Sequence, residues 1–406
     1  MPIVIFATPF FNANAVGFIN ALCSLPNVRL GVIAQEAQER LPTALRQTID
    51  AHYKVDNVFD AAHLAFAAKT LRNYLGGLDK FLAVNEQIQV PVAEAREALG
   101  VEGLSVESAK NFRDKARMKS RFAAADIPCA KHAAVTKPSH AVEFATAVGF
   151  PLVLKPLAGA GSQSTFQIQH EKDLHDALLR IQPSDANPAV IEEFVLGQEH
   201  SLETVSVNGN AVWQSCTYYL PAALDVMRNQ WIQWRIILPR EASSDVYADI
   251  RQTGAKALQA LGMTTGVSHL EWFRKRTGKI AISEVGARPP GAQIMTLNSR
   301  AFDIDFISAW ARLMVYGEFI PPEQKSAAGV AFLRGQGAGR VKAVHGFEAA
   351  TAEVGHLFTD VKLPDIGQPA SGTYEGEGFV IVRHSDTAVV EQALQRVIEL
   401  VRVELW

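Results

Sequence analysis

The first hundred residues alternate short apolar runs with amphipathic stretches. The apolar runs lie at residues 2–7, 28–33, 58–60 and 81–84. Amphipathic stretches near 16–25 and 35–48 follow the first two runs. Strands that alternate with helices in this way predict a parallel α/β sheet. No G-x-G-x-x-G follows the first run, so the pattern gives little support for a dinucleotide site there.

From about residue 105 the predicted elements become longer and their order changes. A basic amphipathic helix is predicted over 108–125. Further helices are expected at residues 141–148, 171–181, 245–261, 302–316 and 387–401. Strands are expected at residues 151–155, 189–194, 201–207 and 211–219. From about 329 the chain is rich in Gly and Val, which predicts several short strands before the last helix.

Composition limits the kinds of protein that the chain can be. Its 406 residues are too many for one ordinary core, so two or three domains are expected. A net charge of −3 gives no reason to expect nucleic acid or an anionic membrane as a partner. No apolar run is long enough to span a membrane, and the N-terminus lacks the pattern of a signal peptide. The three cysteines form no close pair, so we expect a cytoplasmic enzyme without disulfides or a zinc site.

The segment with the clearest chemistry is an acidic β-hairpin. Two β-rich stretches within residues 268–285 flank a charged turn. One register places Thr277 and Gly278 at the centre of this turn, and in that register Glu271 lies directly opposite Glu284. Facing carboxylates repel each other, and a hard cation such as Mg²⁺ would remove the repulsion while it also binds nucleotide phosphates. The alternative is a solvated acidic hairpin with a shifted register.

A lysine at the end of an apolar strand, Lys155, precedes a loop of small residues. Backbone N–H groups in such a loop can surround phosphate oxygens while the ammonium approaches them. The lysine precedes the glycines and no G-K-[ST] is present, so this is not a Walker A loop. A plain flexible connection is the alternative. The loop residues considered for phosphate binding are Gly159, Gly161, Ser162, Gln163 and Ser164.

A second acidic segment follows the strand predicted at 189–194. A strand that leaves its sheet can present backbone groups to the edge of a planar base, with apolar side chains against the faces of the base. Glu199 would then offer its carboxylate to ribose hydroxyls. An ordinary edge strand with solvated acids is the alternative.

Two cations complete the pattern. Lys115 in the basic helix is a candidate to balance the charge of a polyphosphate, although a solvated helix face is the alternative. Arg288 follows Glu284 by four residues, and its guanidinium suits bidentate recognition of a phosphate or carboxylate. The next residues, Pro289, Pro290 and Gly291, would hold the backbone rigid beside it.

Taken in order, these motifs resemble the ATP-grasp superfamily, particularly its carboxylate–amine ligases of the L-amino-acid ligase and D-alanine–D-alanine ligase type. The shared features are the two lysines, E-E-F-V-x-G-x-E and E-x12-E-V-G-A-R-P-P-G, over about residues 105–300. The resemblance implies an α/β fold in three parts. These are an N-terminal parallel α/β domain (1–107), a two-lobed α+β ATP-grasp domain (108–328, lid lobe about 128–195) and a small C-terminal α+β piece (329–406).

The resemblance also implies a role for each motif. The lysines and the small-residue loop would contact the phosphates of ATP, and E-E-F-V-x-G-x-E would contact its adenine and ribose. The residues expected at the nucleotide are Lys115, Lys155, Gly159, Gly161, Ser162, Gln163, Ser164, Glu192, Phe194, Val195 and Glu199. Glu271 and Glu284 would hold Mg²⁺ or Mn²⁺. Gly286 stands where many members have a further asparagine ligand, which leaves the second metal's coordination open. The residues expected to be catalytic are Arg288, Lys155 and His269.

The implied reaction joins a small-molecule carboxylate to an amine. A substrate carboxylate would attack ATP to give an acyl phosphate, and an amine would displace phosphate to form an amide or dipeptide bond. Amino acids are the expected substrates, and a homodimer is compatible with such an enzyme. The alternatives are a purine-pathway ligase, a formate-using transferase or a catalytically silent ATP-binding regulatory module.

The substrate side is less clearly marked in the sequence. The residues expected near it are His269, Trp231, Trp234, Arg235 and Arg334. Arg235 or Arg334 would bind a substrate carboxylate and the tryptophans would form a small pocket, with core packing as the alternative for the aromatic residues. His269 shares a strand face with Glu271 and would orient substrate or accept a proton, unless it is a hydrogen-bonded core histidine.

Overall fold

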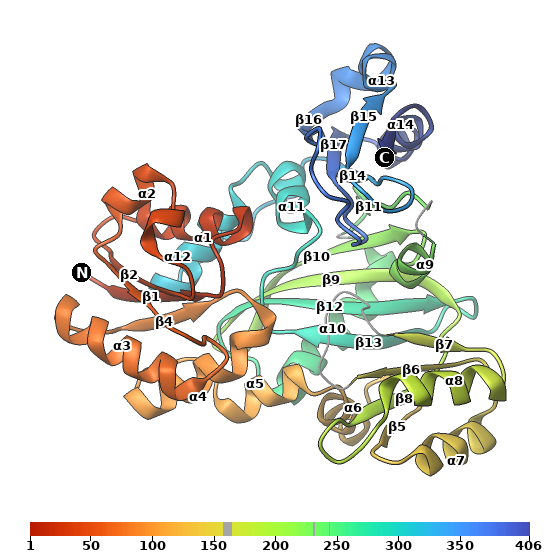
Figure 1. Cartoon of the computed structure of the whole chain (residues 1–406), viewed down its shortest axis with the longest axis horizontal. Coiled ribbons are helices and arrows are strands. Elements are labelled where there is room, and N and C mark those ends of the chain that lie inside the picture. The colour runs from red at the N-terminus through yellow and green to blue at the C-terminus, as the bar shows by residue number, and fades with distance from the viewer. Residues whose placement is uncertain (157–164, 230–231, 243) are drawn as a thin grey trace.

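The structure, a computed structural model, describes residues 1–156, 165–229, 232–242 and 244–406 (Figure 1). It begins with the predicted parallel sheet, whose strands pair in the order β3-β2-β1-β4. The strands are β1 (Ile3–Thr8), β2 (Arg29–Ala34), β3 (Ala51–Lys54) and β4 (Lys80–Ala83). β1, β2 and β4 each begin one residue from a predicted run, which confirms the parallel α/β start of the chain.

Two predicted elements of this region are wrong. Val58 does not belong to a strand, although it is fully buried, because it packs into the core from the loop before α3 (Ala61–Leu75). The helix predicted over 35–48 is only a single 3₁₀ turn and the short α2 (Thr43–Thr48). Pro42 restricts the residue before it to an extended conformation, and this interrupts the helix.

Helices cover both faces of the parallel sheet. α3 and α4 (Gln89–Leu99) pack on the face that carries Ile5 and Phe81. α1 (Ala13–Cys23) and α12 (Phe306–Tyr316) pack against each other on the other face. There Phe6 meets Trp310 of α12 edge-on, with ring centroids 6.5 Å apart. A helix from far along the chain therefore completes the N-terminal layer, because a parallel sheet needs cover on both faces.

The basic helix predicted over 108–125 is two helices, α5 (Val106–Arg113) and α6 (Lys115–Ala124). Asp114 lies between them with φ −93° and ψ 111°, and its carboxylate accepts hydrogen bonds from the N–H groups of Ala116 and Arg117. An aspartate that caps a new helix competes with continuation of the old one. The break places Lys115 in the first turn of α6.

A four-stranded antiparallel sheet forms a lobe of its own, with the order β5-β8-β6-β7. Its strands are β5 (His132–Val135), β6 (Leu152–Pro156), β7 (Phe166–Ile168) and β8 (Ala189–Glu193). Two helices pack on this sheet and share a separate apolar core with it. They are α7 (Pro138–Val148) and α8 (Glu171–Ile181).

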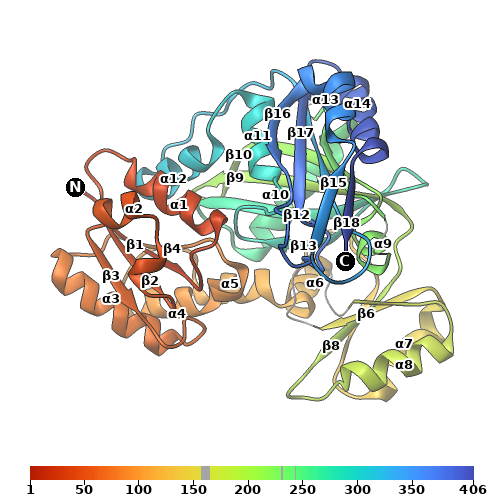
Figure 2. The same cartoon turned by 45° about the horizontal axis from the view of Figure 1, so that its top comes forward.

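The largest sheet has eight strands in the order β13-β12-β9-β10-β11-β14-β17-β16, and every neighbouring pair is antiparallel. The strands are β9 (Gly197–Val207), β10 (Asn210–Leu220), β11 (Arg235–Leu238), β12 (Gly266–Lys275), β13 (Ile280–Gly286), β14 (Ala327–Leu333), β16 (Phe358–Lys362) and β17 (Gly378–His384). The boundary predicted at 328/329 falls inside β14, and β16 and β17 beyond it continue the same sheet (Figure 2). The division into three domains remains a prediction.

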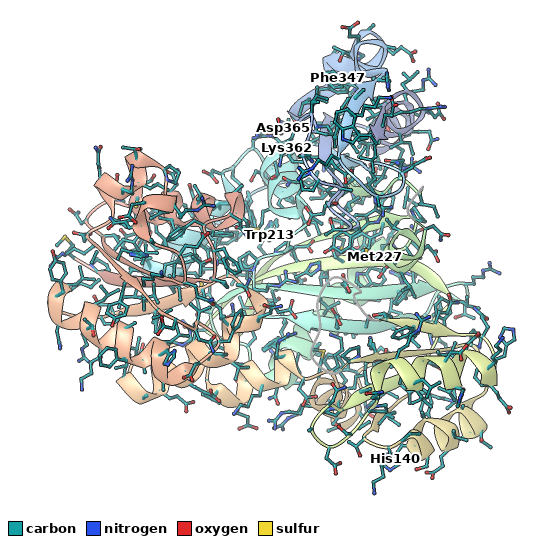
Figure 3. The ribbon with its side chains drawn as sticks, viewed as in Figure 1. His140, Trp213, Met227, Phe347, Lys362 and Asp365 are labelled. Atoms are coloured by element: carbon teal, nitrogen blue, oxygen red, sulfur yellow. The ribbon has the colours of Figure 1, made fainter. Side chains whose placement is uncertain are left out.

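The remaining elements pack around this central sheet. They are α9 (Ala223–Arg228), α10 (Ala248–Leu261), α11 (Ile294–Phe302), α13 (Phe347–Val354), α14 (Thr387–Leu400), β15 (Val341–His345) and β18 (Arg402–Leu405). The helix predicted over 302–316 starts later, at α12, because Asp303 has φ 54° and Asp305 caps the new helix. Trp213 of β10 packs against Phe302 at this junction, with ring centroids 5.0 Å apart (Figure 3). Within the described ranges, no helix is both long and apolar enough to cross a membrane.

Candidate active site

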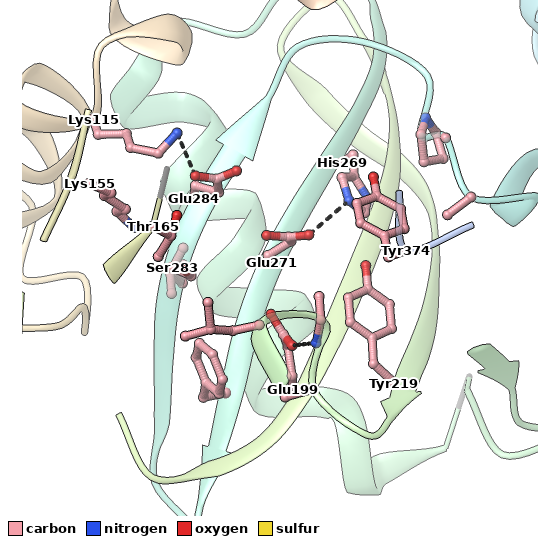
Figure 4. A pocket seen from close by; sticks show the side chains of 18 of the residues that line it. Lys115, Lys155, Thr165, Glu199, Tyr219, His269, Glu271, Ser283, Glu284 and Tyr374 are labelled. Carbon is pink, nitrogen blue, oxygen red and sulfur yellow. Dashed lines mark hydrogen bonds and ion pairs between the residues drawn. The ribbon is translucent and has the colours of Figure 1, made fainter. Parts of the chain in front are cut away.

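A cavity of about 350 Å³ lies where the small lobe, the central sheet and the segment after β4 meet. Figure 4 shows charged side chains on one side of it and tyrosines on the other. The predicted site residues that line it are Lys115, Lys155, Glu192, Phe194, Val195, Glu199, Trp234, His269, Glu271, Glu284 and Arg288. The structure therefore brings together motifs that are far apart in the sequence.

The acidic hairpin has the predicted pairing, with Glu271 of β12 opposite Glu284 of β13. Its turn differs from the predicted turn, which had Thr277 and Gly278 at its centre. The N–H groups of Lys275 and Gly278 bond to the carbonyls of Lys279 and Lys275, and Gly278 has φ 81°. Three residues therefore form the turn, because a glycine with positive φ closes a three-residue connection readily.

A bulge in β13 restores the pairing that this longer turn would shift. Trp272 pairs with Ile282, whereas Glu271 pairs with Glu284, so Ser283 is the extra residue. Bulges reorient side chains and occur often beside active sites. The prediction of facing carboxylates is thus correct, but for a reason that the sequence pattern did not contain.

The second hairpin carboxylate, Glu284, forms an ion pair with Lys115 and also interacts electrostatically with Lys155. Lys115 Nζ lies 2.6 Å from Glu284 Oε2, and the lysine side chain is 8% exposed. Burial alone would raise the pKa of Glu284, but Lys115 and Lys155 outweigh it and lower that pKa to about 2. The carboxylate is therefore ionised at neutral pH, as a metal ligand must be.

Glu192 of β8 lies between two buried lysines. Lys155 Nζ is 3.0 Å from its Oε2, and Lys119 Nζ is 3.1 Å from its Oε1. Lys119 is fully buried, and burial is the main cause that lowers its pKa. Lys119 was not singled out from the sequence. Its spacing of four residues from Lys115 in one helix was the available signal, because such residues share a face.

Glu199 of β9 lies at the base of the cavity (Figure 4). Its Oε2 accepts a hydrogen bond of 2.7 Å from the N–H of Ala223. Burial, with repulsion from Glu271, raises the pKa of Glu199 to about 8. A buried carboxyl group whose second oxygen has no hydrogen-bond partner among the described residues suits hydroxyl groups as partners.

His269 of β12 lies between two carboxylates. Its Nδ1 is 2.8 Å from Glu203 Oε1, and its Nε2 is 3.6 Å from Glu271 Oε1. Burial favours the neutral ring, but the interactions with Glu203 and Glu271 outweigh it and raise the pKa of His269 to about 9. The imidazolium thus orients Glu271, one of the two hairpin carboxylates.

Arg288 follows β13 and binds a carboxylate from the N-terminal region. Its Nη2 and Nε lie 2.8 and 3.0 Å from Glu86 Oε2. Arg113 donates to the other oxygen of Glu86 at 2.9 Å. Glu86 is a site residue that the sequence analysis missed. Its place just after β4 was a usable signal, because ligands bind at the carboxyl ends of parallel strands.

Three aromatic residues face the other part of the cavity. Trp234 packs edge-on against Tyr219 and Tyr374, with ring centroids 5.4 and 4.7 Å away. The indole N–H donates to the carbonyl of Pro221 at 3.1 Å. Tyr219 and Tyr374 had no motif around them, and only the fold places them here.

The two arginines proposed for the substrate carboxylate are not at the cavity, and this prediction is wrong. Arg235 follows Trp234 in β11 and therefore points to the opposite face of the sheet, near Glu391 and Glu399. The Arg334 guanidinium donates to the carbonyls of Ile232 and Asn229. The predicted residues outside the described ranges are Gly159, Gly161, Ser162, Gln163, Ser164 and Trp231.

The donor set fits a divalent cation that is shared with phosphates. Glu271 and Glu284 face each other, and magnesium typically takes one or two carboxylates together with phosphate and water oxygens. Within the described ranges, no group of three or more His, Cys, Asp or Glu could hold a metal ion. A Cβ at Gly286 would make only ordinary contacts, with Arg288 Cγ at 3.5 Å, so there is room for a Cβ at this position.

Comparison with known families agrees with this geometry. Residues 120–303 match the ATP-grasp domain family. The matched range contains the small lobe, the strands β9 to β13 and Arg288. The chain therefore contains an ATP-grasp domain, which confirms the resemblance seen in its motifs.

Two curated relatives come from Bacillus subtilis. The L-arginine-specific L-amino acid ligase is 24% identical over 272 residues, which are 66% of this chain and 65% of that protein. Alanine–anticapsin ligase of strain 168 is 24% identical over 262 residues, which are 60% of this chain and 55% of that protein. The match thus spans less than two thirds of the length of either relative.

Solved structures share the fold over the whole chain. The L-amino acid ligase of Bacillus licheniformis has a TM-score of 0.78 at 17% identity and covers 100% of this chain and 99% of its own. The N5-carboxyaminoimidazole ribonucleotide synthetase of Thermotoga maritima has a TM-score of 0.73 at 19% identity, with 100% of both chains covered. These similarities confirm the mixed α/β fold class.

Proposed function

We propose that this protein is an ATP- and Mg²⁺-dependent ligase that activates a carboxylate as an acyl phosphate and joins it to an amine. The observation that carries the proposal is the pair Glu271 and Glu284, which face each other beside Lys115 and Lys155 in an ATP-grasp domain. Both curated relatives bear the names of ligases that act on amino acids. Amino acids are therefore the substrate class that we assign.

The charged side of the cavity is the proposed site of ATP. Lys155 and Lys115 would bind phosphate oxygens, and Glu199 would bind the ribose hydroxyls with its available oxygen. Phe194 and Val195 line the cavity next to Glu192, where their backbone would contact the adenine. Mg²⁺ held by Glu271 and Glu284 would neutralise the charge of the phosphates.

In the first step an oxygen of the substrate carboxylate attacks the γ-phosphorus of ATP. The bond from that phosphorus to the bridging oxygen breaks, and ADP leaves with the electron pair. The product is an acyl phosphate. Lys115 and Lys155 position the phosphates and offset their charge, which is the main work of a protein in phosphoryl transfer.

In the second step the amine nitrogen attacks the acyl carbon, the carbon–oxygen bond to phosphate breaks, and phosphate leaves. The nitrogen loses one proton as the amide forms, and the departing phosphate takes up this proton as hydrogen phosphate. Arg288 would stabilise the charge that develops on the departing phosphate. His269 is held by its hydrogen bond to Glu203 and lies 3.6 Å from Glu271, so we assign it to orienting Glu271.

The test is ADP release from ATP and Mg²⁺ with amino acids supplied singly and in pairs, with mass detection of products. The proposal predicts that one pair stimulates release and yields the mass of the two amino acids minus water. If no amino acid or pair stimulated ADP release although ATP binds, amino acids would not be the substrates. A nucleotide-like amine that stimulates release where amino acids fail would favour a purine-pathway ligase.

Glu284→Gln provides the residue-level test, because it keeps the shape of the side chain and removes its charge. We expect at least about a 100-fold lower turnover, comparable with the loss of one electrostatic group in other active sites. Glu353→Gln is the matched control, since Glu353 is an exposed residue of α13 paired with Arg396. Near-normal turnover of Glu284→Gln would contradict the proposed metal site. A silent nucleotide-binding module would show no turnover in the wild type either.

A further inference from the structure

The long connection between β16 and β17 brings one side chain into the cavity. Among the described residues that line it, Tyr374 is the one that comes from beyond Ile294. Figure 3 labels Lys362 and Asp365 at the start of this connection. In Figure 4 Tyr374 is drawn on one side of Glu271, and Lys115 and Lys155 are drawn on the other. Tyr374 therefore belongs to the side away from the proposed phosphates.

The loop that carries Tyr374 is fixed at its base. The carboxylate of Glu377 accepts hydrogen bonds from the N–H groups of Gly335 at 2.7 Å and Ser371 at 2.8 Å, and Glu377 is 6% exposed. Gly376 has φ 64°, and a Cβ there would lie 2.6 Å from Arg334 Cγ. Only glycine fits such a position without rearrangement. The loop therefore has a fixed conformation and forms part of the cavity wall.

The same loop contacts the segment that follows Arg288. The carboxylate of Glu375 accepts a hydrogen bond from the backbone N–H of Ala292. Ala292 and Gln293 have φ values of 50° and 60°, which are unusual for residues with a Cβ. Strained backbone persists where surrounding structure holds it in place. Tyr374 and Arg288 are therefore kept in a fixed spatial relation.

The wall around Tyr374 combines aromatic surface with nearby charged side chains, among them Glu271 and Arg288. Trp234 and Tyr219 are 2% and 3% exposed, so the main chain and neighbouring rings hold both in place. The polar group of Trp234 is engaged with Pro221. Aromatic rings held in this way limit size more than they select charge, because interiors are close-packed and cannot expand at low cost.

We propose that Tyr374 is a specificity-determining residue that limits the size of the side chain of an amino-acid substrate. The inference rests on the proposed ligase function and deepens it by assigning the substrate side chain to the aromatic part of the cavity. The ring of Tyr374, packed on Trp234, closes this part of the cavity. Replacing the ring with a methyl group makes room for a longer side chain.

The experiment compares the full-length wild type with Tyr374→Ala and Tyr374→Phe. For each enzyme, kcat/KM is measured for glycine, alanine, valine, leucine and phenylalanine, together with the KM for ATP. The wild type should prefer the small residues. Tyr374→Ala should raise kcat/KM for leucine or phenylalanine, relative to alanine, at least about tenfold, since one methylene in a pocket is worth about 10–200-fold. The KM for ATP should stay constant. Tyr374→Phe, which keeps the ring, should preserve the wild-type ranking.

Three results would overturn the inference. An unchanged ranking in folded Tyr374→Ala is the first, and a wild type that already prefers large side chains is the second. An equal fall in kcat for every amino acid, with a raised KM for ATP, is the third and indicates a structural role. If Tyr374→Ala does not fold, Tyr374→Leu tests the same shift. If the wild type releases no ADP with any amino acid, the proposed function itself fails, and this is distinguishable from a wild type that is active with an unchanged ranking.

Discussion

The parallel N-terminal sheet and the central antiparallel sheet are both buried, yet they bury different kinds of side chain. In β1 the residues from Val4 to Ala7 are all apolar and fully buried. The neighbouring strands β2 and β4 contribute further buried apolar residues to both faces. This sheet has the composition of a structural core.

The central sheet buries polar groups in addition to apolar ones, and most of these polar groups have partners. Ser201 and Thr217 share a hydrogen bond of 2.6 Å, and Ser215 donates to Asn298 at 2.7 Å. Glu203, which is fully buried, bonds to His269. Buried polar groups cost little stability when they are paired, and they set side-chain positions narrowly. Both sheets therefore contribute apolar core, and the buried polar chemistry is concentrated in the central sheet.

The largest expected effect separates the two sheets by stability. Phe6→Ala in β1 should lower the free energy of unfolding by about 3–5 kcal/mol, because it removes a buried ring next to Trp310. Turnover of the folded fraction should remain normal. Urea unfolding and ADP release measure the two quantities. Phe66→Ala on α3 is the control, since Phe66 is 64% exposed and should change stability by no more than about 0.5 kcal/mol.

The next prediction concerns pH and the central sheet. His200 of β9 stacks on Trp272, with ring centroids 4.3 Å apart, and burial lowers the pKa of His200 to about 4. An unfolded histidine has a pKa of about 6.5. Between these values the unfolded chain binds a proton that the folded chain does not bind. The stability that depends on neutral His200 is therefore present above pH about 6.5 and is lost as the pH falls to about 4.

Urea unfolding of the wild type and His200→Gln at several pH values measures this effect. Over that pH range the free energy of unfolding of the wild type should fall by roughly 3 kcal/mol more than that of the variant, at about 1.4 kcal/mol for each pKa unit. His175→Gln is the control, because His175 is exposed on α8. If the free energies of unfolding of the wild type and His200→Gln changed in parallel with pH, burial of His200 would not be the cause of the stability lost at low pH.

A smaller effect is expected from the buried lysine on α6. Lys119→Met leaves the pair of Glu192 and Lys155 intact but removes the second positive charge that Glu192 contacts, behind the wall of the cavity. The KM for ATP should rise about tenfold, since a nearby unit charge contributes on the order of 1–4 kcal/mol. Steady-state kinetics with varied ATP measure it. Lys110→Met, at an exposed ion pair with Glu94, is the control, and equal KM values for both variants would contradict the assignment.

An effect of similar size should come from Glu86, which links the end of β4 to Arg288 after β13. Glu86→Gln keeps one hydrogen-bond acceptor for Arg288 but removes the charge that Arg288 and Arg113 share. We expect kcat/KM for the amino acid to fall about tenfold, as is common when the partner of a functional side chain is changed. The KM for ATP should stay the same. If only the KM for ATP changed, Glu86 would contribute to nucleotide binding and the assignment would be wrong.

Much of the fold could be predicted because its elements have local signals. Apolar runs marked β1, β2 and β4, and the periodicity of residues 171–181 gave the bounds of α8. The places where prediction failed depended on single residues. Asp114 ended one helix by capping the next, and Pro42 interrupted another. Such capping and steric effects compete with periodicity and outweigh it locally.

The motifs alone determined the ATP-grasp domain and the residues of its charged side, because ionic chemistry needs specific residue types at specific spacings. Glu271 and Glu284 face each other only because Ser283 forms a bulge that shifts the register of β13. Glu86, Lys119 and Tyr374 entered the site only through tertiary structure. Their partners lie on other strands, helices and loops, and a linear sequence does not state which distant segments will pack together.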